Sequence, residues 1–496
     1  MIYLGKNMPI FYSALLLTAV NLLLRFFGTG FQVYLSSRIG AEGIGLLQLV
    51  MSVGAMAMVA GMAGIRTATM YLSAEELGKR RPGNIRWILS GCMRYSVLCS
   101  GTIATAVYLL APWLAENWIG NPFVTEAIRL YAAFLPVNCL CGVMVGYFTG
   151  AQRIGTLAAV EVAEQLFSMV CTVILLTVRA GTDAVRSCQA VILGSGMGAC
   201  LTLSCLMILR LRERIPSGPR IPVAQRLMNV ALPLAAADDL KTGINTVENL
   251  MVPKRLALYS GVTSPLAAFG IVSGMVFPVL MFPACILYGL AELLIPELAR
   301  CAAAGSRSRI HYLVRRSLKA TMVYGLLLCG LEFLLAQTLC TALYHEPRAG
   351  DQLRLYSLLI PMLYCDSIVD AMTKGLGQQK ICVRYNIITS TLDVILLYLL
   401  LPNYGMIGYF ISFTVTHLIN FILSLQRLLK ITGIRIRPLL PMMALSAAGA
   451  SLLAVSSLPT AAQAAAYPAM LLALLFLLRV IDTEDLHWIK NLIRKR

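Results

Sequence analysis

Residues 187–210 read SCQAVILGSGMGACLTLSCLMILR and carry no charged side chain before Arg210. A transmembrane helix needs about 20 consecutive, mainly apolar residues to cross the hydrocarbon core of a bilayer. A strand of a transmembrane barrel would be only about 10 residues long, with alternating polarity. The length and continuity of this run therefore predict a membrane-spanning α-helix.

Similar apolar runs recur along the whole chain, which predicts an all-α, polytopic membrane protein with about 14 spans. They lie at roughly 11–33, 45–70, 87–112, 125–150, 156–178, 187–210, 227–251, 266–294, 317–340, 353–376, 381–402, 405–427, 438–457 and 462–481. A connection at 211–226 that contains Pro, Gly and Ser follows the sixth run and reads as a linker. We therefore expect a six-helix lobe at 1–215, a second six-helix lobe at 216–430, and two further helices with a tail at 431–496.

The composition excludes an ordinary soluble protein. The 496 residues are 58% hydrophobic and 13% charged, whereas a soluble domain carries about 25% charged residues. The net charge is +18, and its basic residues gather in alternate connections, such as 79–86 and 211–226, while 112–122 has neither Lys nor Arg. Cytoplasmic loops carry such an excess, so both termini are expected in the cytoplasm. This distribution accounts for the basic charge without a nucleic-acid partner.

Ionisable side chains inside the predicted spans are the main functional signal, because such groups normally face protein or water. The first two spans contain Arg25 and Arg66, and the seventh contains Asp239, Lys241 and Glu248. Guanidinium groups bind phosphate oxygens in pairs, so we expect a wet cavity that accepts a lipid pyrophosphate. The alternative is that these groups form ion pairs between helices and only fix the packing.

Prolines are expected to kink two spans, because each removes a backbone hydrogen bond. Pro233 lies in the seventh span, and Pro278 and Pro283 lie in the eighth. The kinks are either static or bending points for alternating access. The two halves of the chain also correspond weakly, as is common in secondary transporters.

The sequence gives little support for catalysis. None of the four His residues has a metal-ligand partner at i+4, and the chain contains no phosphate-binding loop that ends in Gly-Lys-Ser/Thr. We therefore expect no enzyme activity, no metal site and no cofactor. Transport would be passive, an exchange, or driven by a gradient of H⁺ or Na⁺.

Five segments resemble one family of transporters. They are 37–49 (SRIGAEGIGLLQL), 145–153 (VGYFTGAQR), 245–256 (NTVENLMVPKRL), 269–296 (FGIVSGMVFPVLMFPACILYGLAELLIP) and 402–409 (PNYGMIGY). Together they resemble the stage V sporulation protein B group of polysaccharide-type transporters, which is related to lipid II flippases. This group belongs to the multidrug/oligosaccharidyl-lipid/polysaccharide exporter superfamily.

The resemblance implies a V-shaped, two-lobe bundle with a central cavity. It implies flipping of lipid-linked peptidoglycan or polysaccharide precursors across a bacterial cytoplasmic membrane, for spore cortex or cell-wall synthesis. The arginine that the family has in its first helix falls on Arg25, and its acidic position in the seventh falls on Glu248, where Asp is usual. The basic pair of the family falls on Lys254 and Arg255, while Arg66 stands where the family tends to have Pro.

The expected partners are a lipid-linked sugar and membrane lipids, and the chain is expected to be a monomer. Two other functions stay open. A cation-coupled multidrug exporter would favour an acidic cavity, for which Asp238/Asp239 or Asp366/Asp370 could serve. A membrane scaffold in cell-wall synthesis would predict a closed bundle or a large outer loop, and no such loop is evident in the sequence.

Overall fold

The described part of the chain is built from helices. The computed structural model describes residues 10–79, 81–180, 183–213, 223–434, 439–455, 457–478 and 480. No strand occurs among these residues, which confirms the predicted all-α class. Helices suit a bilayer because each satisfies its backbone hydrogen bonds within one segment.

The α-helices follow one another with short connections. In chain order they are α1 (Ile10–Met62), α2 (Ile65–Gly78), α3 (Ile85–Trp113), α4 (Thr125–Gly150), α5 (Ile154–Leu175), α6 (Ala184–Leu211), α7 (Ala224–Leu256), α8 (Pro265–Ile271), α9 (Phe277–Met281), α10 (Cys285–Ala303), α11 (Arg307–Tyr344), α12 (Pro347–Ser357), α13 (Ile360–Gly375), α14 (Gln379–Thr432), α15 (Leu439–Val455) and α16 (Thr460–Leu477). Short 3₁₀ or π turns join or extend them at η1 (Pro82–Asn84), η2 (Leu114–Ile119), η3 (Pro122–Val124), η4 (Leu176–Ala180) and η5 (Val272–Val276).

Seven helical segments among the described residues are long and apolar enough to cross a membrane. The number rises to nine if each of two bent helix pairs counts as one span. Two of the seven segments contain a kink, at Gly40 in α1 and at Gly405 in α14, where the backbone φ is positive. The chain is thus a multi-pass membrane protein, and the number of fourteen spans stays a prediction.

The eighth predicted span is bent, as its prolines led us to expect. The helix Pro265–Met281 and the following Cys285–Ala291 are inclined by 62°. Pro278 lies in the first turn of α9, and Pro283 lies in the break itself. By contrast, α7 is assigned as helix throughout, including residue 233.

The chain divides into two compact units. Unit 1 comprises Met1–Gly274 and Val394–Gly408, and unit 2 comprises Met275–Asp393 and Tyr409–Arg496. Unit 1 therefore includes a middle stretch of α14 that lies far away in the sequence. It also includes α7, which the sequence analysis placed in the second lobe. The predicted lobe boundaries at 215 and 430 stay a prediction.

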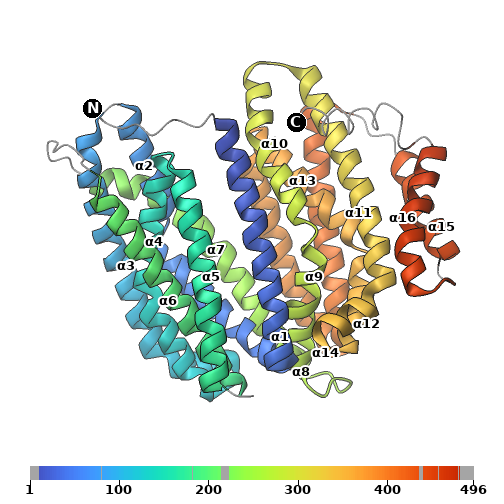
Figure 1. The fold of residues 1–496 in the computed structure, drawn as a ribbon, viewed down its shortest axis with the longest axis horizontal. Helices are drawn as coiled ribbons and strands as arrows, with labels where there is room; N and C mark the ends of the chain where they lie inside the picture. Colours follow the sequence, from blue (N-terminus) through green and yellow to red (C-terminus); the bar gives the residue numbers. More distant parts are fainter. Residues whose placement is uncertain are drawn as a thin grey trace. The chain divides into compact units, whose positions relative to one another are not determined.

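Unit 1 is a bundle in which α4 is the central helix. It contacts α2, α3 and α6, and α5 packs on α6 (Figure 1). The main core lies among α2, α3 and α4, with additional side chains from α5, α6 and α7. Phe148 and Ile65 are among its fully buried side chains. This packing fixes the helices that carry the candidate site.

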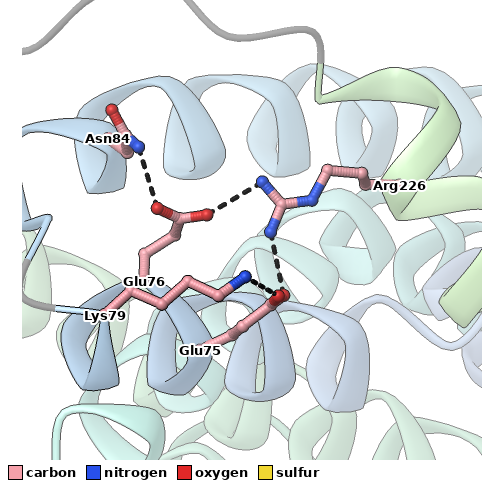
Figure 2. Close-up of polar contacts among 5 residues, drawn as sticks. All are labelled: Glu75, Glu76, Lys79, Asn84 and Arg226. Carbon is pink, nitrogen blue, oxygen red and sulfur yellow. Dashed lines mark hydrogen bonds and ion pairs between the residues drawn. The ribbon is translucent and has the colours of Figure 1, made fainter.

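A polar network joins the end of α2 to the beginning of α7 (Figure 2). Arg226 donates one hydrogen bond to Glu76 and one to Glu75, each at 2.8 Å. Glu76 also accepts from Asn84 at 2.8 Å, and Lys79 pairs with Glu75. Because the Glu76 side chain is only 3% exposed, both of its oxygens depend on these partners.

Replacing Glu76 with Leu is expected to lower the free energy of unfolding of the purified protein by about 1–3 kcal/mol, because Asn84 and Arg226 would each lose a partner. Thermal unfolding in detergent measures the change. The matched control is Glu126→Leu, which breaks an exposed pair with Arg129 within α4 and should cost less than about 1 kcal/mol. Equal losses in the two variants would contradict a role for the network in stability.

Unit 2 packs around α11, which contacts α10, α12, α13, α15 and α16. The last two helices form a hairpin whose apolar side chains share a core with α11 (Figure 1). On α13, Asp370 pairs with Lys374 one turn later. Asp366 instead accepts hydrogen bonds from Asn420 of α14.

Candidate substrate-binding site

The candidate site begins at the break between α1 and α2. Ala63 and Gly64 both have positive φ, of 41° and 71°. A Cβ on Gly64 would lie 3.2 Å from the amide nitrogen of Ala235, so the glycine allows α2 to begin directly against α7. The break leaves the carbonyl of Ala63 to accept a hydrogen bond from the hydroxyl of Tyr95 on α3, at 3.4 Å.

Arg66 lies in the first turn of α2, and its side chain is exposed. Glu161 of α5 is half-buried and interacts electrostatically with Arg66. The first turn of α2 has no side-chain cap and no acidic residue. The guanidinium and the positive end of this helix therefore favour an anion at the same place.

Helix α5 extends the polar region towards α1. Glu164 accepts a hydrogen bond from the hydroxyl of Thr202 on α6, at 2.6 Å. The side-chain nitrogen Nε2 of Gln165 lies 3.5 Å from the position that a Cβ on Gly28 would occupy. Arg25 precedes Gly28 by about one helical turn, and its side chain is exposed. Helix α5 thus approaches both α1 and α2 with polar side chains.

Helix α7 contributes Asp239, which is half-buried and interacts electrostatically with Tyr95. Since Tyr95 also contacts the break, Asp239 belongs to the same region as Arg66. Lys241 is exposed, two positions further along α7. We call Arg25, Arg66, Glu161, Glu164 and Asp239 the polar layer of unit 1.

Glu248 is half-buried further along α7, outside the polar layer. Its neighbourhood joins α7 to α1, because Asn249 donates to the hydroxyl of Ser52 at 3.0 Å. Thr246 donates to the backbone carbonyl of Ser52 at 3.2 Å. These bonds fix the position of α7 along α1.

The predicted basic pair lies at the far end of α7. Lys254 donates to the carbonyl of Asn117. Arg255 donates to the carbonyl of Tyr398 at 2.8 and 3.2 Å, and its guanidinium carbon lies 3.5 Å from the centre of that ring. At a rise of about 1.5 Å per residue, Lys254 is roughly 22 Å along the helix from Asp239.

The structure thus divides the predicted site. Arg66 and Asp239 lie near the break between α1 and α2, and Arg25 lies on α1 about one turn from the contact of Gly28 with α5. Lys254 and Arg255 anchor the far end of α7. Glu161 and Glu164 lie within the predicted span 156–178, but their place beside Arg66 and Thr202 depends on helix packing. Substrate binding by these residues stays a prediction.

Comparison with known proteins shows what this chain is similar to. The profile of the polysaccharide biosynthesis protein family matches residues 11–229. Stage V sporulation protein B of Bacillus subtilis (strain 168) is 21% identical over 411 residues, which cover 80% of this chain and 79% of that protein. The predicted resemblance to the stage V sporulation protein B group is confirmed.

Solved structures show that this chain shares its fold with known transporters. The lipid II flippase MurJ in an inward closed conformation has a TM-score of 0.69 at 13% identity, over 93% of this chain and 98% of that one. An inward-facing multidrug resistance MATE family transporter of the MOP superfamily has a TM-score of 0.65 at 14% identity, over 84% and 98%. At these identities the likeness shows the fold alone.

Proposed function

We propose that this chain is a flippase for lipid-linked sugar precursors, and that the polar layer of unit 1 binds their pyrophosphate. The observation that carries the proposal is the pair of exposed guanidinium groups of Arg25 and Arg66 within membrane-spanning helices. A cation at membrane depth is costly unless it faces protein or water. The guanidinium of Arg66 lies in the first turn of α2, at the positive end of that helix, and suits a bound anion, while Arg25 adds a second cation on α1.

The homology supports the same class of substrate. The matched profile describes polysaccharide biosynthesis proteins, and one solved structure of the same fold is a lipid II flippase. We infer that the substrate is linked to a polyprenyl pyrophosphate and crosses a bacterial cytoplasmic membrane. We place both termini in the cytoplasm on the distribution of Lys and Arg. The chain would act as a monomeric transporter without enzymatic chemistry.

A cation-coupled multidrug exporter is the second candidate, because the polar layer also contains three carboxylates. Glu161, Glu164 and Asp239 could attract a cationic drug or a coupling ion. The fold is also similar to that of a MATE family transporter. The two arginines favour the anionic substrate, since a guanidinium beside the site repels a cationic drug.

Proteoliposomes that contain the full chain test the proposal. The probe is a polyprenyl-pyrophosphate disaccharide with a fluorescent label on the sugar, and an impermeant quencher reports which leaflet holds it. We expect the chain to speed equilibration of this lipid between leaflets, because a wet path removes the cost of moving the head group through hydrocarbon. Ethidium uptake by the same vesicles is the control for drug export.

Ethidium transport without equilibration of the labelled lipid would overturn the proposal in favour of the second candidate. A single-chain phospholipid analogue with the same label distinguishes specific flipping from a leak in the bilayer. Equal acceleration of both lipids would also contradict a specific pyrophosphate site.

A further inference from the structure

Glu332 is a buried acid in the middle of α11, outside the polar layer of unit 1. It lies in the apolar stretch 325–336, which reads GLLLCGLEFLLA. The residue is only 5% exposed. Neither carboxyl oxygen has a hydrogen-bond partner among the described residues. An unpaired carboxylate in such surroundings would be very costly, so this position tolerates the neutral acid.

Within the described ranges, the groups that interact electrostatically with Glu332 are hydroxyls and thiols rather than cations. They are Tyr324, Cys329 and Cys340 of its own helix and Tyr364 of α13. Such groups are neutral at physiological pH, so none of them supplies a counter-charge.

Charged groups on α10 and α13, which pack against α11, have partners of their own, since Glu297 pairs with Arg300 and Asp370 pairs with Lys374. On α12, Asp351 accepts a hydrogen bond from Gln337. Of the two C-terminal helices, α15 contains no titratable residue and α16 contains only Tyr467, whose hydroxyl donates to the carbonyl of Leu326. From α12, the guanidinium of Arg354 lies over the ring of Phe333, 4.8 Å from its centre. That ring follows Glu332 in the chain, and the arginine makes no hydrogen bond to the carboxyl group in the described part of unit 2.

The hydroxyl groups of the two tyrosines that interact with Glu332 form hydrogen bonds to the bend that follows α9. Tyr364 donates to the carbonyl of Leu280, and Tyr324 donates to the carbonyl of Pro283, each at 2.9 Å. Their rings stack with centroids 6.1 Å apart. A proline break frees carbonyls of this kind, and the two hydroxyls satisfy them. Glu332 lies on the same helix as Tyr324, about two turns further along, and interacts electrostatically with both tyrosines that hold this bend.

We propose that Glu332 is a proton-binding site that couples the conformation of unit 2 to a proton gradient. In the described conformation the carboxylic acid keeps its proton. When a change at the bend lets water reach the side chain, the O–H bond breaks, and the proton passes to water while the electron pair stays on the carboxylate. Return to the buried state requires that the carboxylate take a proton from water again. The coupling to sugar-lipid flipping rests on the proposed function, whereas the proton site does not.

The proton site is tested by infrared difference spectra of the purified full-length protein between neutral and strongly alkaline pH, a range in which exposed carboxyl groups stay ionised throughout. Wild type should show a carbonyl band from a protonated carboxyl group, and Glu332→Gln should lose that band. The matched control, Glu346→Gln, removes an acid that pairs with Arg348 near the start of α12 and should retain it. If the Gln variant does not purify, Glu332→Met removes the acid without adding a polar group. A band that survives both substitutions would overturn the proton site.

The coupling is tested with the labelled polyprenyl-pyrophosphate disaccharide in vesicles that carry a pH gradient. The wild-type flipping rate should change when the gradient is reversed, and the Glu332→Gln rate should lose this dependence. A gradient response that persists in the variant, or a wild-type rate without any response, would overturn the coupling. If wild type flips no labelled lipid at all, the proposed function fails, and the infrared result still decides the proton site.

Discussion

Replacing Arg25 and Arg66 together with Gln is expected to slow flipping of a polyprenyl-pyrophosphate disaccharide by about 100-fold or more. A hydrogen bond between charged groups contributes about 1.5–3 kcal/mol, and about 1.4 kcal/mol corresponds to a factor of ten. Two such contacts to the pyrophosphate would therefore account for at least that loss. Membrane insertion should be preserved, because the substitutions remove charges from membrane-spanning helices.

The measurement is the initial flipping rate in proteoliposomes, at a lipid concentration well below saturation. Arg94→Gln is the matched control, because Arg94 is also an exposed arginine of a spanning helix but bonds to Ser90 of its own helix. Replacement of both arginines with Lys should restore part of the rate, since Lys keeps the charge but not the paired geometry. A folded double Gln variant that flips at the wild-type rate would refute the assignment of Arg25 and Arg66.

The second large effect is expected at Gly270, where α8 crosses α1. A Cβ at this position would lie 2.7 Å from the amide nitrogen and 3.0 Å from the Cα of Gly45, and it would also meet the carbonyl of Ala41. All three contacts are with backbone, so no side chain can move aside. Gly270→Val should therefore force α8 away from α1 and lower the free energy of unfolding by about 3 kcal/mol.

The expected result is a fall in the yield of monodisperse protein in detergent and in its thermal midpoint. Gly101→Val on α3 is the control, since no atom lies within 4 Å of a Cβ there. Crossings of small residues allow membrane helices to approach closely. A normal yield of Gly270→Val would contradict the close backbone contact between α8 and α1 at this position.

The membrane class could be predicted because apolar runs of about 20 residues, repeated along a chain, are typical of membrane helices. The bend at Pro283 was equally predictable, since its cause is local to the residue. The kink at Gly40 also falls where the sequence marks a break, in the polar stretch between the predicted spans 11–33 and 45–70, whereas its positive φ is visible only in the structure.

The site was only partly predictable, because spacing along one helix says nothing about which helices pack together. The sequence indicated that Arg25 and Arg66 are unusual, but not that Glu161 lies beside Arg66. The family resemblance added Lys254 and Arg255 to the expected site, and the structure shows them bound to carbonyls at the far end of α7. Glu332 was overlooked, although a single acid within twelve otherwise uncharged residues was a readable signal.

The contact between Arg255 and Tyr398 has a consequence for biosynthesis. The two residues are separated by 143 positions, and ribosomes add about 5–20 residues per second. Tyr398, whose carbonyl Arg255 binds, is therefore synthesised roughly 7–30 s after Arg255. During this interval the ribosome synthesises α9 to α13 while unit 1 still lacks residues 394–408. The last step in the assembly of unit 1 therefore occurs late in translation. A nascent chain arrested before residue 394 would leave this arginine without its acceptor.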